Sequence, residues 1–513
     1  TSMPQIIPEE LEVDWKQIEV QQGKLDGRFG AQFAGGSSAI KSNFGVLRKA
    51  GASAREMLIQ AASNNWSISR ALCYAEHGAV YRKDTKAKLT YAELAEAASK
   101  LNLPDNPPVK DPKDFKIIGR AIPGVDNFDI VTGKAEFGLD SRPAGMRVAV
   151  IERCPMYGGI VKSVDDSEAL RIEGVEQIIR IEPTENATEL VAGVAVIARN
   201  TWAAMKGRKA LAVTWDFSGL GPESDEKLSS AFEQNINTVS DPVRDDGNVD
   251  DAFDQCEKTA EAVFEVPFLA HATMEPMNYI ADVKPGSVDL WGPTQVPGNA
   301  MAMAMHITGV SPQNIKVRMT RVGGGFGRRL MADYACEAIY LSKSIGKPVQ
   351  VVWTREDDIR HDFFRPAGMY KLKAGLDKNN KLIAWHLSAS TTSRYAFAGS
   401  MNPPYMTEVF PDGFPAGFVE NFRMQYIPAE SKVPRGAWRG PGHNATAWID
   451  QCFLDEMAGL AGKDPVDFRL ELLGEEDKVV PYRDHAGTSY STRRLKNVIH
   501  LAAEKSDWYS PAP

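Results

Sequence analysis

The pattern of hydrophobic positions changes twice around a glycine-rich segment in the second half of the chain. Hydrophobic and polar residues alternate over residues 315–320, which predicts a half-buried β-strand. Over residues 330–341 the hydrophobic residues recur at helical spacing instead, and Gly346 ends the predicted helix. Residues 349–353 are again typical of a strand. The segment at 322–329, Val-Gly-Gly-Gly-Phe-Gly-Arg-Arg, is therefore expected to be a loop between a strand and a helix.

The first hundred residues predict a mixture of helices and strands. An amphipathic helix is expected to begin after the Gly-Gly-Ser-Ser segment at 35–38 and to continue to Ala61. A second helix is expected over residues 67–78. A third is expected at Thr90, where Thr-Tyr-Ala-Glu has the sequence of a capping box. Prolines at both ends of segment 104–112 then predict a stiff linker.

The rest of the chain predicts further mixed elements. Residues 115–220 are typical of a separate α+β unit, and the acidic run that follows them is expected to be a solvated connection. Towards the C-terminus, residues 445–461 predict an amphipathic helix, and Asp464 and Pro465 predict the N-cap and first residue of the next. Within the α+β unit, the expected elements are strands at 147–151, 177–181, 191–197 and 211–215 and a helix at 202–209.

Composition narrows the class of protein. With 513 residues, 43% of them hydrophobic and 25% charged, the chain is expected to form several ordinary globular domains. A net charge of −8 gives no basic field for nucleic acid or an anionic membrane. No hydrophobic stretch approaches the roughly 20 residues that span a bilayer. The five cysteines are scattered without a Cys-x-x-Cys pair, so neither a local zinc or iron–sulfur site nor a disulfide framework is expected.

The glycine loop is the first candidate binding segment. Glycines let bare backbone N–H groups approach a ligand, and a helix N-terminus behind the loop favours negative charge. The spacing does not match the Gly-x-Gly-x-x-Gly fingerprint of dinucleotide-binding folds, because the last position is Arg328. It does not match a P-loop either, because Gly327 is followed by two arginines. The alternative is a turn that only lets strand and helix pack closely.

Two further loops share this character. Gln295 follows a predicted strand and precedes Pro297, a favoured first residue of a helix, and its neutral amide can donate to a fixed oxygen. Arg439 lies in the segment Arg-Gly-Ala-Trp-Arg-Gly-Pro, where it can reach an anion or a carbonyl group. Each has an ordinary alternative: Gln295 as a surface residue at a helix start, and Arg439 as a surface arginine stacked on Trp438.

Two residue pairs give weaker signals. His271 and Glu275 are four residues apart and could face one metal ion, but no third ligand accompanies them, so a packing or hydrogen-bonding role is favoured. Arg328 and Arg329 could pair with phosphate groups of a cofactor, and surface salt bridges are an equal alternative.

Taken together, these loops resemble the molybdenum-binding subunit of the xanthine oxidase family. The resemblance is strongest to the isoquinoline 1-oxidoreductase beta-subunit type, in which the order of segments is permuted. It covers essentially the whole chain. The segments that carry it are Ala34–Ser38, Thr294-Gln295, Gly323–Arg329, Trp438-Arg439-Gly440 and His271–Asn278, with Thr132–Ala135 similar to the entry of the family's hammerhead domain.

The resemblance implies an α+β fold. A molybdopterin-binding domain of mixed sheets and helices would occupy residues 1–106 and 221–513, with an inserted α/β hammerhead domain at 115–220. It also implies roles for single residues. Gln295 would hydrogen-bond a metal-bound oxo group, and Arg439 would place substrate and stabilise negative charge. The cofactor-binding residues would be Gly36, Ser37, Gly324, Gly325, Phe326, Gly327, Arg439 and Gly440, with no protein ligand to the metal.

The implied activity is that of a molybdenum hydroxylase that adds water-derived oxygen to an aldehyde or an N-heterocycle. Molybdopterin cytosine dinucleotide would be the cofactor, and electrons would pass to a small subunit with two [2Fe–2S] clusters, since no cluster is expected on this chain. The family's catalytic glutamate has no counterpart here, because Gly474-Glu475-Glu476 reads as the solvated end of a helix. The chain is therefore expected to be an inactive part of its subunit. A non-catalytic scaffold is the alternative function. The resemblance favours the bacterial periplasm, and the cytoplasm is the alternative.

Overall fold

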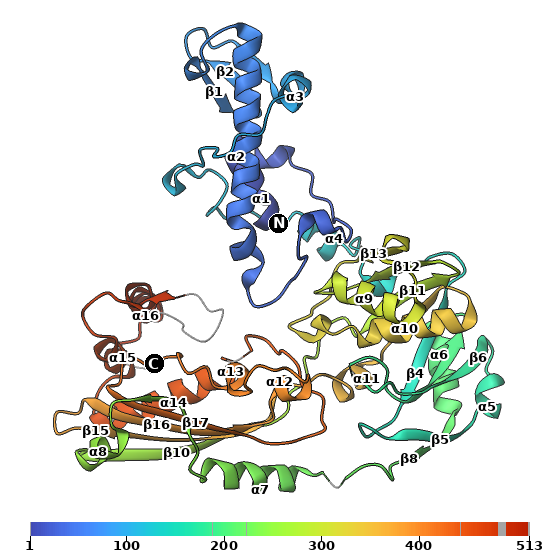
Figure 1. Cartoon of the computed structure of the whole chain (residues 1–513), viewed down its shortest axis with the longest axis vertical. Coiled ribbons are helices and arrows are strands. Elements are labelled where there is room, and N and C mark those ends of the chain that lie inside the picture. Colours follow the sequence, from blue (N-terminus) through green and yellow to red (C-terminus); the bar gives the residue numbers. More distant parts are fainter. Residues whose placement is uncertain (1, 187, 222, 442, 481–488, 511–513) are drawn as a thin grey trace. The chain divides into compact units, whose positions relative to one another are not determined.

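The computed structural model describes all residues except 1, 187, 222, 442, 481–488 and 511–513, and the chain divides into two compact units (Figure 1). The first unit consists of residues 1–142, 286–305 and 310–322. The second consists of residues 143–285, 306–309 and 323–513.

The first unit is built around one long helix, α2 (Ser38–Trp66), against which α1 (Ser2–Leu11) packs (Figure 1). The C-terminal half of α2 shares a hydrophobic core with a small antiparallel sheet and with α3 (Tyr91–Ser99). Thr90 and Glu93 form the predicted capping box of α3. The sheet strands are β1 (Cys73–Glu76), β2 (Ala79–Arg82) and β3 (Lys88–Thr90).

The helix predicted over residues 67–78 is wrong. Ser67 adopts a left-handed conformation that ends α2, and residues 73–76 form strand β1. A two-residue turn connects β1 to β2, and both of its residues, His77 and Gly78, have positive φ angles of 46° and 75°. Turns of this kind match the twist of a β-hairpin, which explains why the chain leaves the helical pattern here.

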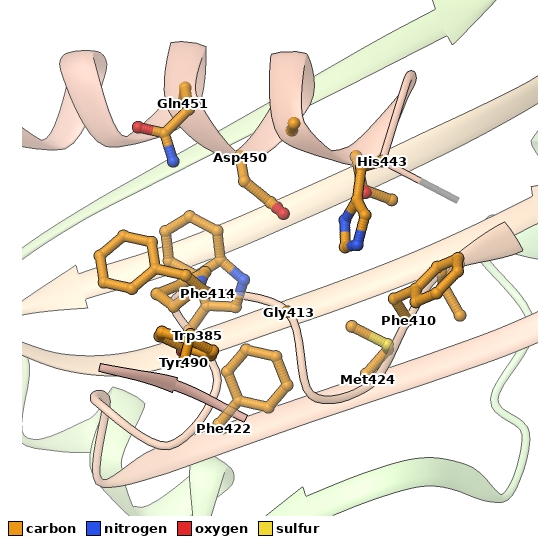
Figure 2. A pocket seen from close by; sticks show the side chains of 14 residues that line it. Trp385, Phe410, Gly413, Phe414, Phe422, Met424, His443, Asp450, Gln451 and Tyr490 are labelled. Atoms are coloured by element: carbon orange, nitrogen blue, oxygen red, sulfur yellow. The ribbon is translucent and has the colours of Figure 1, made fainter. Parts of the chain in front are cut away.

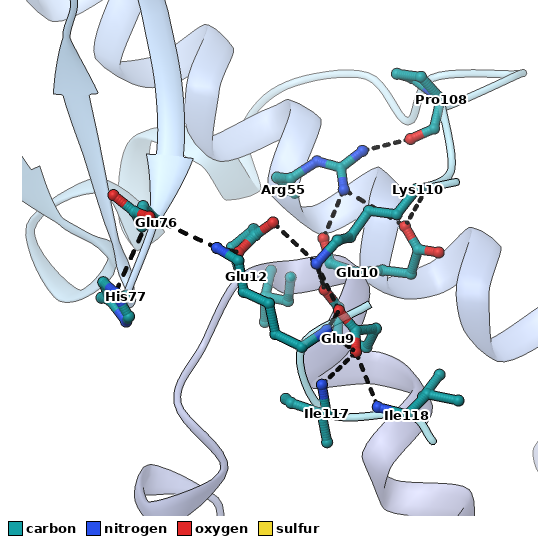
Figure 3. A network of polar contacts seen from close by, with 12 residues as sticks. Glu9, Glu10, Glu12, Arg55, Glu76, His77, Pro108, Lys110, Ile117 and Ile118 are labelled. Carbon is teal, nitrogen blue, oxygen red and sulfur yellow. Dashed lines mark hydrogen bonds and ion pairs between the residues drawn. The ribbon is translucent and has the colours of Figure 1, made fainter. Parts of the chain in front are cut away.

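The proline-containing segment after α3 is anchored to α1 by two buried carboxylates (Figure 3). Glu9 accepts hydrogen bonds from the backbone N–H groups of Ile117 at 2.6 Å and Ile118 at 2.9 Å, and from the ammonium group of Lys110. Glu10 accepts from the backbone N–H of Lys110 at 2.9 Å. The segment predicted as a linker is therefore held by side chains that are at most 1% exposed.

The first unit also contains the parallel pair β12 (Ser287–Gly292) and β13 (Ile315–Met319), which confirms the strand predicted before the glycine loop. Its other helices are α4 (Asn127–Val131) and most of α9 (Pro297–Thr308). Short 3-10 helices along the whole chain are Trp15–Gln17, Gly27–Phe29, Arg70–Leu72, Pro112–Asp114, Gly138–Asp140, Pro312–Asn314 and Arg328–Leu330.

A five-stranded mixed sheet forms one half of the second unit. Its strands follow the order β10 (Lys258–Val266), β15 (Gly368–Leu376), β16 (Leu382–Thr391), β17 (Asn421–Pro428) and β9 (Pro242–Asp246). Helix α14 (Thr446–Ala461) lies along this sheet, and Phe453 packs edge-on against Trp385 of β16 with 5.3 Å between ring centroids. This burial explains why the helix predicted at 445–461 is confirmed.

The other half contains the strands β11 (Asn278–Lys284), β14 (Val349–Val352), β4 (Arg147–Arg153), β7 (Gly193–Ala198) and β6 (Val175–Ile181), hydrogen-bonded in that order. Strands β5 (Ile160–Asp165) and β8 (Ala212–Asp216) pair separately, as do β18 (Val479–Val480) and β19 (Tyr490–Ser491). The helices of the unit are α5 (Ser167–Leu170), α6 (Thr201–Ala210), α7 (Asp225–Ile236), α8 (Val249–Asp254), α10 (Asp333–Ile345), α11 (Arg355–Arg360), α12 (Arg394–Phe397), α13 (Tyr405–Glu408), α15 (Pro465–Leu473) and α16 (Thr492–Lys505).

The four strands and the helix predicted between 115 and 220 are confirmed, and β5 was missed. Asp464 caps α15 and Pro465 begins it, as predicted. The acidic run is not only a solvated connection, because it forms β9 and α8 and its Asp245 pairs with Arg423. In the part of the chain that the structure describes, no helix has the length and hydrophobicity needed to cross a membrane.

Candidate functional site

The glycine loop has a backbone conformation that few residues other than glycine could adopt. Gly324 and Gly327 have φ angles of 105° and 114°. A Cβ atom on Gly327 would lie 1.5 Å from the carbonyl oxygen of Ala437, so no other residue fits without moving the backbone. Phe326 has a φ angle of 57° and a side chain that is 49% exposed. A large ring in a strained conformation, turned towards solvent, is an arrangement found at binding sites.

The loop that carries Arg439 lies directly against the glycine loop. The backbone N–H of Arg439 donates to the carbonyl oxygen of Phe326 at 2.9 Å. The guanidinium group lies 4.4 Å from the centre of the Phe326 ring and 4.9 Å from that of Trp438. One of its nitrogens donates to the carbonyl oxygen of His271 at 2.6 Å. The predicted stacking on Trp438 is therefore present, but Phe326 is the nearer ring.

His271 connects the same two loops to the protein interior. Its Nδ1 lies 2.9 Å from a carboxylate oxygen of Asp362, and its Nε2 lies 3.0 Å from the carbonyl oxygen of Ala437. Burial alone would raise the pKa of Asp362, but the His271 hydrogen bond and the Arg328 charge hold it below its usual value. His271 and Asp362 are each 1% exposed, so this contact fixes Ala437 two residues before Arg439.

Glu275 holds the glycine loop by hydrogen bonds, as His271 holds the loop of Arg439. Its carboxylate accepts from the backbone N–H of Gly323 at 2.9 Å and from the amide of Asn278 at 3.0 Å. The backbone N–H of Glu275 donates back to the carbonyl oxygen of Gly323 at 2.9 Å. The hydrogen-bonding role favoured for His271 and Glu275 is confirmed. Among the described residues, no group of three His, Cys, Asp or Glu side chains is placed to hold a metal ion.

The two arginines after the loop form salt bridges, as one of the two predictions had it, but these salt bridges are buried and not at the surface. Arg328 is 1% exposed and pairs with Asp333 at 2.6 Å and Asp362 at 3.1 Å. Arg329 is 0% exposed and donates to the carbonyl oxygens of Gly324 at 2.7 Å and Glu275 at 2.8 Å. Arg329 therefore satisfies a carbonyl oxygen of the glycine loop and supports its strained shape, whereas Arg328 is held by the carboxylates of Asp333 and Asp362.

The predicted helix N-terminus behind the loop is also displaced. Helix α10 begins at Asp333, six residues after Gly327, because Arg328 to Leu330 form a separate 3-10 turn. Asp333 itself lies in the first turn of α10, where a negative charge is favourable, and it is already paired with Arg328. The glycine loop therefore does not offer a helix N-terminus to an anion.

The remaining predicted residues lie together in the first unit. The side-chain amide of Gln295 donates to the carbonyl oxygen of Ala34 at 2.6 Å, and the backbone N–H of Ala34 donates to the carbonyl oxygen of Gln295 at 2.9 Å. Gly36 and Ser37 follow with positive φ angles of 59° and 53°, directly before α2. The structure thus brings Gln295 beside the Gly36–Ser37 turn.

The predicted residues form two groups, one in each unit: Gln295 with the Gly36–Ser37 turn, and Arg439 and Gly440 with the loop that contains Gly324 to Gly327. Sequence reasoning missed Asp362, which holds His271. Asp362 lies 91 residues along the chain from His271. Its neighbours show no motif that marks it, and only the folded arrangement identifies it.

Comparison with known proteins identifies the family of the chain. Two family profiles, each described as a molybdopterin cofactor-binding domain, match residues 231–473 and residues 1–128. Isoquinoline 1-oxidoreductase subunit beta of Brevundimonas diminuta is 28% identical over 99% of this chain and 69% of its own length. The membrane-bound aldehyde dehydrogenase [pyrroloquinoline-quinone] of Gluconacetobacter polyoxogenes is 28% identical over 99% of this chain and 68% of its own length.

Among solved structures, quinoline 2-oxidoreductase from Pseudomonas putida 86 superposes with a TM-score of 0.58 at 17% sequence identity. The match covers 76% of this chain and 55% of that one, so this chain spans little more than half of the solved protein. The mixed sheets and helices described above are therefore structurally similar to molybdenum hydroxylase large subunits. The chain belongs to the xanthine oxidase family and carries molybdopterin cofactor-binding domains of its large subunit.

Proposed function

We propose that the complete protein is a molybdenum hydroxylase that adds water-derived oxygen to an aldehyde or an N-heterocycle. The observation that carries this proposal is the contact between the glycine loop and Arg439, in which the guanidinium group stacks 4.4 Å from the exposed ring of Phe326. The names of the two relatives, an isoquinoline oxidoreductase and an aldehyde dehydrogenase, support the two substrate classes.

The residues of both groups fit the cofactor. In the first unit, the first N–H groups of α2 receive no cap from the Ser37 side chain, and such groups favour an anionic phosphate. A Cβ atom at Gly36 would meet no atom within 4 Å, so the turn has open space before it. In the second unit, Gly324 and Gly325 present backbone without side chains. We assign molybdopterin cytosine dinucleotide to these segments, with Gly36, Ser37, Gly324, Gly325, Phe326, Gly327, Arg439 and Gly440 as the residues that hold it.

When bound, the cofactor supplies the metal that delivers oxygen and accepts two electrons. The chain positions the substrate. The backbone of Arg439 is fixed by Phe326 and one of its guanidinium nitrogens by His271, so the charged group is held in one orientation beside the loop. It can stabilise negative charge that develops on the substrate. Gln295, which already orders Ala34, would direct its amide towards an oxygen of the cofactor.

The proposal extends to domains and partners. Residues 1–106 and 221–513 would form the molybdopterin-binding domain, and residues 115–220, with the helix α6 between strands β7 and β8, would form the hammerhead domain. Electrons would leave through a small subunit that carries two [2Fe–2S] clusters. This agrees with relatives whose names describe them as subunits.

The test uses the complete gene product with its partner subunit. Elemental analysis should find molybdenum, and the complex should reduce an artificial dye when given an aldehyde or an N-heterocycle. Arg439→Lys should lower kcat/KM by about a hundredfold, because an ammonium group keeps the charge but loses the planar stacking on Phe326. Arg423→Lys, which changes an arginine paired with Asp245 and Asp250, is the matched control and should have little effect.

A purified complex without molybdenum would contradict the proposal and favour the scaffold function. Equal kinetics for the two lysine variants would instead remove Arg439 from the substrate site.

A further inference from the structure

A cavity of about 240 Å³ lies in the second unit between helix α14 and the strands β16 and β17 (Figure 2). Its walls are largely aromatic and include the rings of Trp385, Phe410, Phe414, Phe422 and Tyr490. Pockets for drug-sized ligands are about 300–1,000 Å³, so this cavity suits a smaller molecule. The face of an aromatic ring is negative, so a wall of several rings attracts a positive group as well as an apolar one.

The wall of this cavity contains one acidic side chain. Asp450 projects from α14 into the space between the rings of Trp385 and Phe414 on one side and His443 on the other (Figure 2). Asp450 is only partly buried, so its carboxyl group is open to a molecule that enters the cavity. Among the described residues that line the cavity, no lysine or arginine accompanies Asp450. The ionised carboxyl group therefore gives the cavity a negative charge.

The other polar side chains of the wall do not cancel this charge. The ring centre of His443 lies 4.6 Å from that of Phe410, so His443 adds another flat ring to the wall, and an imidazole is neutral at about pH 8. Gln451 and Tyr490 add a neutral amide and a neutral phenol.

This combination of groups narrows the class of ligand. The carboxylate of Asp450 would repel an anion, and a neutral apolar ligand would cover that carboxylate without compensating its charge. A hard metal ion such as calcium takes six to eight oxygen ligands, which a wall made mainly of rings does not provide.

We propose that this cavity binds a compact organic cation of the trimethylammonium type, with the carboxylate of Asp450 as counter-charge and the rings of Phe410 and Phe414 against its methyl groups. Such a cation has no N–H group, so it requires no hydrogen-bond acceptor from the rings, and its methyl groups make apolar contacts with them. The site is separate from the proposed reaction, because neither Phe326 nor Arg439 lines the cavity.

The binding test uses the 513-residue chain, ligand-observed NMR titration and two probes of the same shape. Choline carries a trimethylammonium group, and dimethylbutanol is the neutral alcohol in which a tert-butyl group replaces it. A pH of about 8 keeps an imidazole neutral and favours the ionised form of Asp450, whose pKa is raised by burial. We expect choline to bind at least about tenfold more tightly, because only the cation is attracted by the carboxylate and the ring faces. This comparison needs no variant, so it does not depend on how a mutant folds.

Two substitutions assign the contacts. Asp450→Asn removes the counter-charge and should weaken choline binding by about tenfold. Phe414→Leu keeps an apolar side chain but removes a ring face, and it should weaken choline binding by about fivefold. Both variants should bind dimethylbutanol as the unmodified chain does, which also shows that the cavity is still folded. Asp455→Asn is the matched control and should leave choline binding unchanged, because Asp455 is on the same helix, is 55% exposed and pairs with Arg469.

Equal affinity for the two probes, or no binding of choline, would overturn the proposal. Displacement of choline by an equal concentration of potassium chloride would also overturn it, in favour of a general counter-ion at Asp450. Because the measurement requires neither cofactor nor turnover, each of these results leaves the proposed hydroxylase function untouched.

Discussion

Two carboxyl groups in this protein have pKa values that are shifted in opposite directions. Glu9, in the first unit, is 1% exposed and accepts hydrogen bonds from Lys110 and three consecutive backbone N–H groups (Figure 3). Burial by itself would raise its pKa, yet these donors hold the pKa of Glu9 below its usual value. Asp450, in the second unit, has no such donors among the described residues, and burial raises its pKa.

The difference shows that the burial of a carboxyl group does not by itself reveal its role. A carboxylate whose oxygens are all satisfied stabilises the segments it joins, here α1 and the segment that contains Ile117. A carboxylate that is desolvated without donors costs free energy, and its pKa rises. Asp362 lies between these cases, because His271 and Arg328 satisfy it and it in turn holds the loop of Arg439.

The largest effect is expected at the satisfied carboxylate. Glu9→Gln should lower the free energy of unfolding by about 3 kcal/mol, because Lys110 loses its buried counter-charge and a new amide donor faces backbone N–H groups. Urea denaturation at neutral pH measures this. Glu12→Gln is the control, since Glu12 pairs with the same Lys110 at 3.0 Å from a more exposed position.

The pH dependence of this difference has a definite sign. Because the folded pKa of Glu9 is lowered, its stabilisation is present above the ordinary value of 4.5 and is lost as the pH falls through the folded value. The two proteins should therefore converge in stability in acid. A difference that stayed constant from pH 7 to strongly acidic conditions would show that packing, not charge, is responsible.

Elements whose signals are local were predictable from sequence, and contacts between distant segments were not. The capping box at Thr90 and the Asp464–Pro465 helix start each depend on a few adjacent residues, and both were predicted correctly. The hairpin turn at His77 was missed because a positive φ angle is uncommon at any residue other than glycine. The contact of His271 with Asp362 joins residues 91 positions apart, so no local pattern contains it.

In the candidate site, too, some features were predictable from sequence and others were not. Its glycines were recognisable because a backbone that approaches a carbonyl oxygen as Gly327 approaches Ala437 excludes every side chain. The burial of Arg328 and Arg329 was not, because an arginine followed by another arginine usually marks a surface. The unpaired state of Asp450 depends on what every neighbouring element fails to offer, which only the folded chain reveals.

An intermediate effect is expected at Asp362. Asp362→Asn should lower the free energy of unfolding by about 2 kcal/mol, because the new amide group would face the ring N–H of His271 as a second donor. It should also lower kcat/KM of the complete enzyme, because His271 holds Ala437 and thereby the loop of Arg439. Chemical denaturation and steady-state kinetics measure the two effects.

Asp333→Asn is the control for this variant, because Asp333 also pairs with buried Arg328. It should reduce stability with a smaller loss of kcat/KM. If both variants reduced kcat/KM equally, the contribution of Asp362 would come through Arg328 and not through His271.

The smallest effect, and the one of opposite sign, is expected at the unsatisfied carboxylate. Asp450→Asn should raise the free energy of unfolding at neutral pH by about 1 kcal/mol, because it removes a charge that is desolvated without compensation. Since the folded pKa of Asp450 is raised, its favourable contribution is complete below the ordinary value of 3.8 and is lost as the pH rises through the folded value. The gain in the free energy of unfolding from Asp450→Asn should therefore grow with rising pH. The loss from Glu9→Gln also grows with rising pH, so the stabilities of the two variants should move apart. Thermal unfolding of both variants across the same pH series measures these two trends. If Asp450→Asn were less stable than the unmodified protein at neutral pH, the carboxylate would have a partner in the folded protein.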